Sequence, residues 1–118
     1  MVNHSPAPIS GPLDRAFLAL ADPTRRAMVE RLSQGAASVS ELASPFAMSL
    51  PAILQHLSVL EGAGLISSAK QGRVRICRIE AGALNPVEDW IAARRREWTE
   101  RLDRLAAFLE ESQKDPTP

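Results

Sequence analysis

Hydrophobic residues in the first third of the chain recur every three to four positions, which is the spacing of one face of an α-helix. Leu13 and Leu20 lie on such a face and predict a helix over residues 13–20. A second helix is predicted after Asp22, because Asp is a favourable N-cap residue and Pro23 suits the first helical position. The pattern therefore predicts two consecutive helices.

Two further helix starts follow closely along the chain. Ser38 and Glu41 have the spacing of a capping box, in which each side chain accepts a hydrogen bond from the other residue's backbone N–H. Ser49 can cap a longer helix over residues 50–62, where Pro51 falls in the first turn and removes no helical hydrogen bond. A short helix and a longer one joined by a tight turn form a helix-turn-helix.

The hydrophobic pattern changes from a helical to an alternating period after Gly64. Residues 65–69 and 73–79 flank Gly72, so the sequence predicts a β-hairpin with its turn at that glycine. Two strands alone are marginally stable, and the hairpin must therefore pack against helices. A helix-turn-helix followed by such a hairpin predicts a winged helix-turn-helix, with residues 65–79 as the wing.

One long helix is predicted from residue 86 to 111, about 39 Å at 1.5 Å per residue. Its apolar stripe exceeds what one small core can cover, so we expect it to form the seam of a two-fold dimer. The predicted fold class is mostly α with a small β-hairpin, about five helices plus a two-stranded wing. We expect a disordered arm over 1–12, a single domain over 13–111 with the dimerisation helix 86–111, and a disordered tail over 112–118.

Only the local distribution of charge can indicate nucleic-acid binding in this chain, because its net charge does not. The 14 Lys and Arg residues balance 14 Asp and Glu residues, so the formal net charge is zero. Between Lys70 and Arg78, however, there are four basic residues and no acidic one. This positive edge of the wing suits contact with phosphates. The alternative interpretation of the hairpin is an ordinary solvated strand face.

The single cysteine and the absence of long apolar runs indicate where the protein works. Cys77 alone excludes an intrachain disulfide framework and fits a reducing cytoplasm. We interpret it as a packed small hydrophobic residue, with a redox switch as the alternative. No apolar run approaches the roughly 18 residues of a membrane span, and residues 1–12 lack a signal-peptide pattern. We therefore expect a cytoplasmic protein without a membrane partner.

The segment MSLPAILQHLSVLEGAGLISSAKQGRVRICRI resembles the recognition helix and wing of the ArsR (arsenical-resistance repressor) family. The earlier segment FLALADPTRRAMVERLSQG resembles the start of the same family's domain. The similarity runs from about Leu13 to Leu109. It implies a dimeric bacterial transcriptional repressor that binds an operator of two half-sites, with its last helix paired with its first helix across the two-fold axis. The dimer interface implied by this resemblance comprises Leu13, Phe17, Trp98, Leu102, Leu105 and Leu109.

The resemblance also places particular residues at the DNA. Gln55 can read an adenine edge, and Leu50 or Ala52 can touch a thymine methyl group. Leu54 stands where the family commonly has Ser or Thr. His56 either reads a base or, as the alternative, contributes to packing or touches a phosphate. The implied DNA-binding residues are Ser49, Leu50, Ala52, Gln55 and His56 on the recognition helix and Lys70, Arg73 and Arg75 on the wing.

Neither a metal nor a cofactor is expected. Metal-sensing relatives use a Cys pair on the first helix of the helix-turn-helix or Asp and His ligands on the last helix. This chain has ELASPFA at the first place and no His on the last helix, so the resemblance is to a regulator that does not sense metal. Trp90 and Trp98 are interpreted as dimer core, with a small-molecule pocket as the alternative. Nothing in the sequence identifies an inducer.

Two other function classes were weighed against the DNA-binding repressor. An enzyme is disfavoured, because the chain has no Tyr, one Cys, two distant His and no Gly-rich phosphate loop. A protein-interaction adaptor that uses the same winged surface is the alternative, since folds of this type host more than one function.

Overall fold

The computed structural model describes residues 11–114. Most of the expected arm over 1–12 and part of the expected tail over 112–118 lie outside the described residues. Where these segments are described, they are helical, because the first helix begins at Gly11 and the last continues to Lys114. Proline in a first helical turn removes no hydrogen bond, so Pro12 does not delay the first helix.

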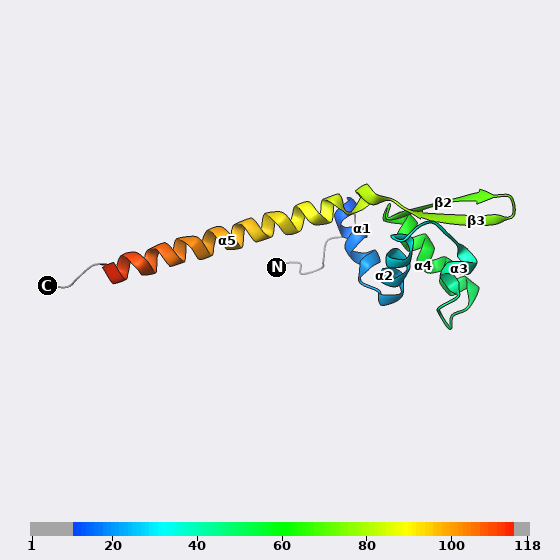
Figure 1. Cartoon of the computed structure of the whole chain (residues 1–118), viewed down its shortest axis with the longest axis horizontal. Helices are drawn as coiled ribbons and strands as arrows, with labels where there is room; N and C mark the ends of the chain where they lie inside the picture. Colours follow the sequence, from blue (N-terminus) through cyan, green and yellow to red (C-terminus); the bar gives the residue numbers. More distant parts are fainter. Residues whose placement is uncertain (1–10, 115–118) are drawn as a thin grey trace, which may run out of the picture. The chain divides into compact units, whose positions relative to one another are not determined.

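The described residues form two compact units that meet at Pro86 and Val87. The first, to Pro86, contains the helix-turn-helix and the wing; the second, from Val87, is the long helix, which was expected to belong to one domain with the rest (Figure 1). The elements in order are α1 (Gly11–Leu20), α2 (Pro23–Leu32), β1 (Ala37–Ser38), α3 (Val39–Ala43), α4 (Leu50–Gly62), β2 (Ile66–Gln71), β3 (Val74–Ile79), the 3-10 helix η1 (Ala81–Leu84) and α5 (Asn85–Lys114).

The predicted helix caps are confirmed. The Asp22 carboxylate accepts the backbone N–H of Arg25 at 3.0 Å and begins α2. Ser38 and Glu41 form both hydrogen bonds of the capping box, each 3.1 Å long. Ser49 Oγ accepts the N–H of Ala52 at 3.4 Å, so α4 occupies the predicted range of residues 50–62.

The sheet is antiparallel and has one strand more than predicted. Its order is β1-β3-β2, and the short β1 pairs Ala37 with Cys77. Gln71 pairs with Val74, which leaves Gly72 and Arg73 as a two-residue turn. Gly72 has a φ of +67°, and glycine at the first turn position is the type II′ pattern that favours hairpins. The turn was expected at residues 70–72; Lys70 and Gln71 instead extend β2.

The core of the first unit fills the space between the helices and the base of the sheet. Its largest fully buried side chains include Met28, Leu32, Ile53 and Leu60 from the helices. Cys77 of β3 is completely buried among them, which confirms that it packs as a small hydrophobic residue. Towards its turn the hairpin is exposed and extends past α3 and α4 (Figure 1). The helices therefore hold the wing at its base and leave its tip to solvent.

Candidate nucleic-acid interface

Helix α4 has one buried face and one exposed face. Ile53, Leu57 and Leu60 point into the core. Leu50 and Leu54 are 58% and 44% exposed. The exposed face also carries Ser49, Pro51, Gln55, Ser58 and Glu61. Helix α4 therefore presents a surface that a DNA groove can receive.

The structure separates the predicted recognition residues into two groups. Ser49, Leu50 and Gln55 are exposed, as direct contact with a base requires. Ala52 and His56 are half-buried, and their side chains are less accessible than that of Leu54. Sequence reasoning noted Leu54 as a departure from the family but did not place it at the DNA. Its position one helical turn after Leu50 was the signal that could have found it.

His56 belongs to a polar cluster that links α4 to the start of α2. Arg25 NH1 lies 3.2 Å from His56 Nδ1, and Asp22 Oδ2 lies 3.8 Å from the same nitrogen. Arginine can only donate, so Nδ1 accepts and the ring proton of the neutral imidazole lies on Nε2. The His56 side chain is 19% exposed. This packing supports the alternative role given to His56, and base reading by His56 stays a prediction.

Arg25 is the central residue of this cluster, and sequence reasoning gave it no role. Its Nε donates to the Ala19 carbonyl at 2.7 Å and its NH2 to the Leu18 carbonyl at 3.0 Å. These carbonyls belong to the last turn of α1, where backbone acceptors have no helical partner. The backbone N–H of Arg25, which the carboxylate accepts, holds the pKa of Asp22 below its usual value of 3.8. Arg25 thus joins α1, α2 and α4.

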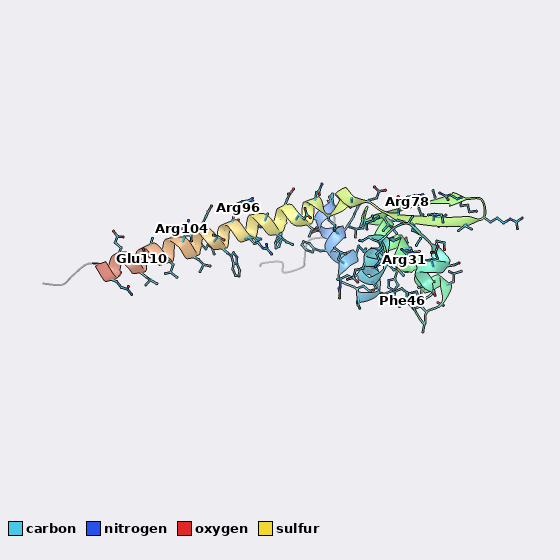
Figure 2. All side chains as sticks on the ribbon, viewed as in Figure 1. Arg31, Phe46, Arg78, Arg96, Arg104 and Glu110 are labelled. Carbon is cyan, nitrogen blue, oxygen red and sulfur yellow. The ribbon has the colours of Figure 1, made fainter. Side chains whose placement is uncertain are left out.

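The turn between α3 and α4 is held by a hydrophobic anchor. Phe46 is half-buried and packs against the core, and Figure 2 labels it within this turn. On α2, Arg31 forms an ion pair of 3.5 Å with Glu41 of α3 and donates to the Gly35 carbonyl at 3.1 Å (Figure 2). The ion pair connects α3 to α2.

The wing carries its basic residues on both faces. Lys70 of β2 lies directly across from Arg75 of β3. Like charges opposite each other destabilise a strand pair, and an anion placed between them would relieve that repulsion. Arg73 is exposed in the turn and has no hydrogen-bond or ion-pair partner within residues 11–114. Arg78 is exposed nearer the base of the hairpin (Figure 2). The predicted wing residues are therefore all accessible.

Arg75 differs from the other basic wing residues because it has local partners. Its NH1 donates to Ser68 Oγ at 2.8 Å, and Ser68 Oγ in turn donates to Glu61 Oε1 at the end of α4. This chain of hydrogen bonds connects the recognition helix to both wing strands. It leaves other guanidinium N–H groups of Arg75 for a phosphate, because arginine has five.

A hollow of about 270 Å³ lies between α4 and β3, with Leu54, Ser58, Glu61, Arg75 and Cys77 in its wall. Burial, and then the negative charge of Glu61, raise the pKa of the Cys77 thiol, and Arg75 offsets this only in part. The thiol is therefore protonated at neutral pH and a poor nucleophile.

Within residues 11–114 no three His, Cys, Asp or Glu side chains are close enough together to hold a metal ion. Among the helices described, none combines the length and the apolar character that a membrane span requires.

Helix α5 presents a long apolar stripe. Trp98 is 69% exposed and Leu102 is 63% exposed. An open hollow of about 490 Å³ runs along the stripe between Trp90 and Leu102. The Arg94 guanidinium lies 5.3 Å from the centre of the Trp90 ring and bonds Glu97 at 2.8 Å. Of the predicted interface residues, Phe17, Trp98, Leu102, Leu105 and Leu109 are exposed and Leu13 is half-buried; Phe108, which the sequence prediction omitted, is also exposed.

Sequence comparisons match this chain to helix-turn-helix transcriptional regulators. A family model described as a helix-turn-helix domain matches residues 20–69. An HTH-type transcriptional regulator of Mycobacterium tuberculosis, Rv2034, is 39% identical over 82% of this chain and 88% of its own length. The transcriptional repressor SdpR of Bacillus subtilis is 29% identical over 67% of this chain and 88% of its own length.

Solved structures show the same fold. The crystal structure of an ArsR family transcriptional regulator has 51% sequence identity and a TM-score of 0.72, and the match covers 75% of this chain and 91% of that one. A homodimeric winged helix-turn-helix DNA-binding domain from Mycobacterium bovis has 26% identity and a TM-score of 0.56, with coverage of 79% and 83%. The predicted winged helix-turn-helix is confirmed, and the chain belongs to the ArsR family of transcriptional regulators.

Proposed function

We propose that this regulator is a DNA-binding repressor that acts as a homodimer in the cytoplasm. The observation that carries the proposal is the pairing of an exposed, nearly uncharged helix face with an exposed basic hairpin, which suit base edges and phosphates respectively. The relatives support it, since one is named a transcriptional repressor and another a homodimeric DNA-binding domain.

In this proposal α4 enters the major groove and supplies the sequence preference. Gln55 offers a side-chain amide, which can form two hydrogen bonds to an adenine edge. Ser49 caps the N-terminus of α4. In this proposal that N-terminus faces the duplex, where its free backbone N–H groups suit a phosphate. His56 has Nε2–H left as a donor, which fits a phosphate contact better than the reading of a base.

The wing supplies affinity that does not depend on sequence. Lys70, Arg73 and Arg75 are the phosphate-binding residues of each wing, with Lys70 and Arg75 paired across the strands. Each phosphate that a basic side chain neutralises releases counterions, so binding weakens as salt rises. No acidic residue lies between residues 62 and 79, and Glu61 is the carboxylate that hydrogen bonds connect to the wing.

The dimer is formed by the apolar stripe of α5. Trp98, Leu102 and Phe108 are each more than 60% exposed on α5, and exposed apolar side chains that follow one another along a helix mark an interaction surface. A second copy of the chain covers this patch in the proposal and repeats the DNA contacts. Two half-sites are then expected roughly 10 base pairs, or a multiple of that spacing, apart.

We assign the protein no reaction, cofactor or metal, because the proposed role needs only a surface. The inducer is left unassigned. A protein-interaction adaptor on the same winged fold is the competing function, and it differs in a measurable way. An adaptor does not discriminate between duplex sequences.

The proposal is tested by selecting binding sites for the full chain from random duplexes, followed by electrophoretic titration of the selected site. We expect an enriched site with internal two-fold symmetry, bound at least 10³-fold more tightly than a scrambled duplex. The Arg73→Ala chain should lose affinity for both duplexes. Arg78→Ala, an equal charge change on the opposite face of β3, is the matched control and should lose less. Failure to enrich any sequence would replace the repressor with the adaptor.

A further inference from the structure

The exposed face of α4 is unusually apolar for a surface that binds a polyanion. Six large apolar side chains are exposed in the first unit, two of them on α1. The other four lie in and around the helix-turn-helix and the wing: Met48, Leu50, Leu54 and Val74. Single exposed apolar residues are ordinary, but two leucines that neighbour each other on one face of the proposed recognition helix indicate an apolar contact there.

Leu50 and Leu54 are neighbours on this face. Residues four apart on a helix place their Cβ atoms roughly 5–6 Å from each other. Neither residue belongs to the core, which Ile53, Leu57 and Leu60 complete on the opposite side of α4. Because Leu54 is not needed for packing, its exposure has to be explained by what α4 contacts.

The rest of the helix limits what α4 can read. It contains no Lys and no Arg, so it lacks the side chains that most often read guanine through its O6 and N7 atoms. Its one carboxylate, Glu61, is engaged by Ser68 at the far end of the helix. The groups left for base edges are two leucines, the Gln55 amide and the Ser58 hydroxyl. In the major groove the apolar group that a leucine can contact is the 5-methyl group of thymine, and the amide suits adenine.

We propose, building on the proposed DNA-binding function, that Leu50 and Leu54 determine specificity by packing against the 5-methyl groups of two thymines in each half-site. Gln55 lies beside Leu54 and reads an adenine of the same A·T-containing step. Leu54 replaces Ala52 as the second apolar contact, since the structure half-buries Ala52. We therefore expect the base pairs that α4 contacts in each half-site to be A·T pairs and not G·C pairs.

Replacement of single thymines in the selected site by deoxyuridine tests this directly, because the exchange removes only the methyl group. With the wild-type chain, two positions in each half-site should lose about fourfold in affinity, the value expected for exposing one buried methyl group. All other thymines should change binding less than twofold. This part of the experiment needs no protein variant and is independent of any effect on folding.

Protein variants then assign each methyl group to a leucine. Leu54→Ser should bind thymine and deoxyuridine equally at one position and keep the fourfold preference at the other. Leu50→Ser should show the reverse. Leu54→Met keeps an apolar side chain and should keep the preference, while Gln55→Ala should lose affinity without changing either ratio.

The outcomes separate this inference from the function on which it rests. A selected site that is bound specifically, but is indifferent to deoxyuridine at every thymine, overturns the inference and leaves the repressor intact. A preference that persists in both serine variants also overturns it. If no duplex is bound specifically, the proposed function fails, and the role of the leucines fails with it.

Discussion

Helix α4 and the β2–β3 wing follow each other in the chain and face the same proposed ligand with opposite chemistry. The exposed face of α4 offers two leucines, an amide and a hydroxyl, and no cation. The wing offers three cations around its tip, and two of them, Lys70 and Arg73, have no hydrogen-bond or ion-pair partner within residues 11–114. Apolar and amide groups distinguish bases, whereas cations respond to phosphates of any sequence. The two regions therefore divide specificity from affinity.

Among the residues that the structure describes, one chain of side-chain hydrogen bonds connects the two regions. Glu61 at the end of α4, Ser68 of β2 and Arg75 of β3 are connected by hydrogen bonds. Because Arg75 takes part in this chain, it positions the wing as well as carrying charge. Arg73 lies beyond it and reports charge alone. A substitution of Arg73 therefore tests the charge of the wing without disturbing the hydrogen bonds that position it.

The largest effect is expected from dissociating the proposed dimer, because a monomer carries only one copy of α4 and of the wing. Leu102→Asp places a charge in the proposed apolar seam of the dimer, where burying it without a partner is costly. We expect a monomer by sedimentation at micromolar concentration and a loss of operator affinity of about 10²-fold or more, since two linked contacts become one. Leu102→Met is the control and should stay dimeric. Sedimentation of the wild-type chain as a monomer would remove the basis of this prediction.

A smaller loss is expected when one base contact is removed from α4. Gln55→Ala should cost about 1–3 kcal/mol for each good base contact and relax the preference at one position in each half-site. Binding to a scrambled duplex should be unchanged. The measurement is competition between the selected site and its single-position variants. An equal loss on every duplex would show that Gln55 contacts the backbone.

A gain of binding is expected when the charge that faces Arg75 is neutralised. Glu61→Gln removes the carboxylate nearest the wing and keeps a side chain that can bond Ser68. We expect all duplexes to be bound about two- to fivefold more tightly at low salt, with the difference lost as salt screens the charges. Glu30→Gln, the same charge change at an exposed position of α2, is the matched control and should leave binding unchanged. Weaker binding by Glu61→Gln would mean that the carboxylate matters chiefly as the anchor of the wing.

The smallest effect concerns the cluster that holds α4 from behind. The folded-state pKa of Asp22 is lowered, so its contribution to stability is present above the unfolded pKa and is lost as pH falls through the folded value. Asp22→Ala should therefore melt at a lower temperature than the wild-type chain at pH 7. The difference between the two melting temperatures should shrink as pH falls below 3.8, the usual pKa of Asp. A difference that stays constant down to pH 2 would exclude a role for the charge.

The difference between α4 and the wing also appears in how well the sequence predicts them. The bounds of α4 are set by Ser49, Pro51 and the glycines after the helix, and all of these signals are local. The hairpin turn begins two residues later than predicted, at Gly72 instead of Lys70, because the pairing of Gln71 with Val74 depends on both strands at once. Strand β1 was missed altogether, since its two residues form a strand only by pairing with β3. Helix bounds that depend on local capping residues can be predicted from the sequence, whereas strand pairing between distant residues cannot.

The candidate site follows the same rule. The resemblance implied Leu50 and Gln55, and local charge indicated the wing cations. The structure exposes all of them, because exposure at these positions follows from place within one element. Packing was one of the roles that the sequence offered for His56, but its partner Arg25 was not predicted, because Arg25 lies 31 positions away. The sequence prediction did not include Leu54 among the DNA-binding residues, although its spacing of four from Leu50 places both on one face of α4.

The most direct test of the account is a salt titration of operator and scrambled duplex binding for Gln55→Ala and Arg73→Ala. We predict that Arg73→Ala weakens both duplexes alike and reduces the salt slope by about one unit per half-site. Gln55→Ala should weaken only the operator and leave the slope unchanged. A wing variant that loses only sequence preference, together with a helix variant that loses only salt dependence, would contradict the division of labour between α4 and the wing.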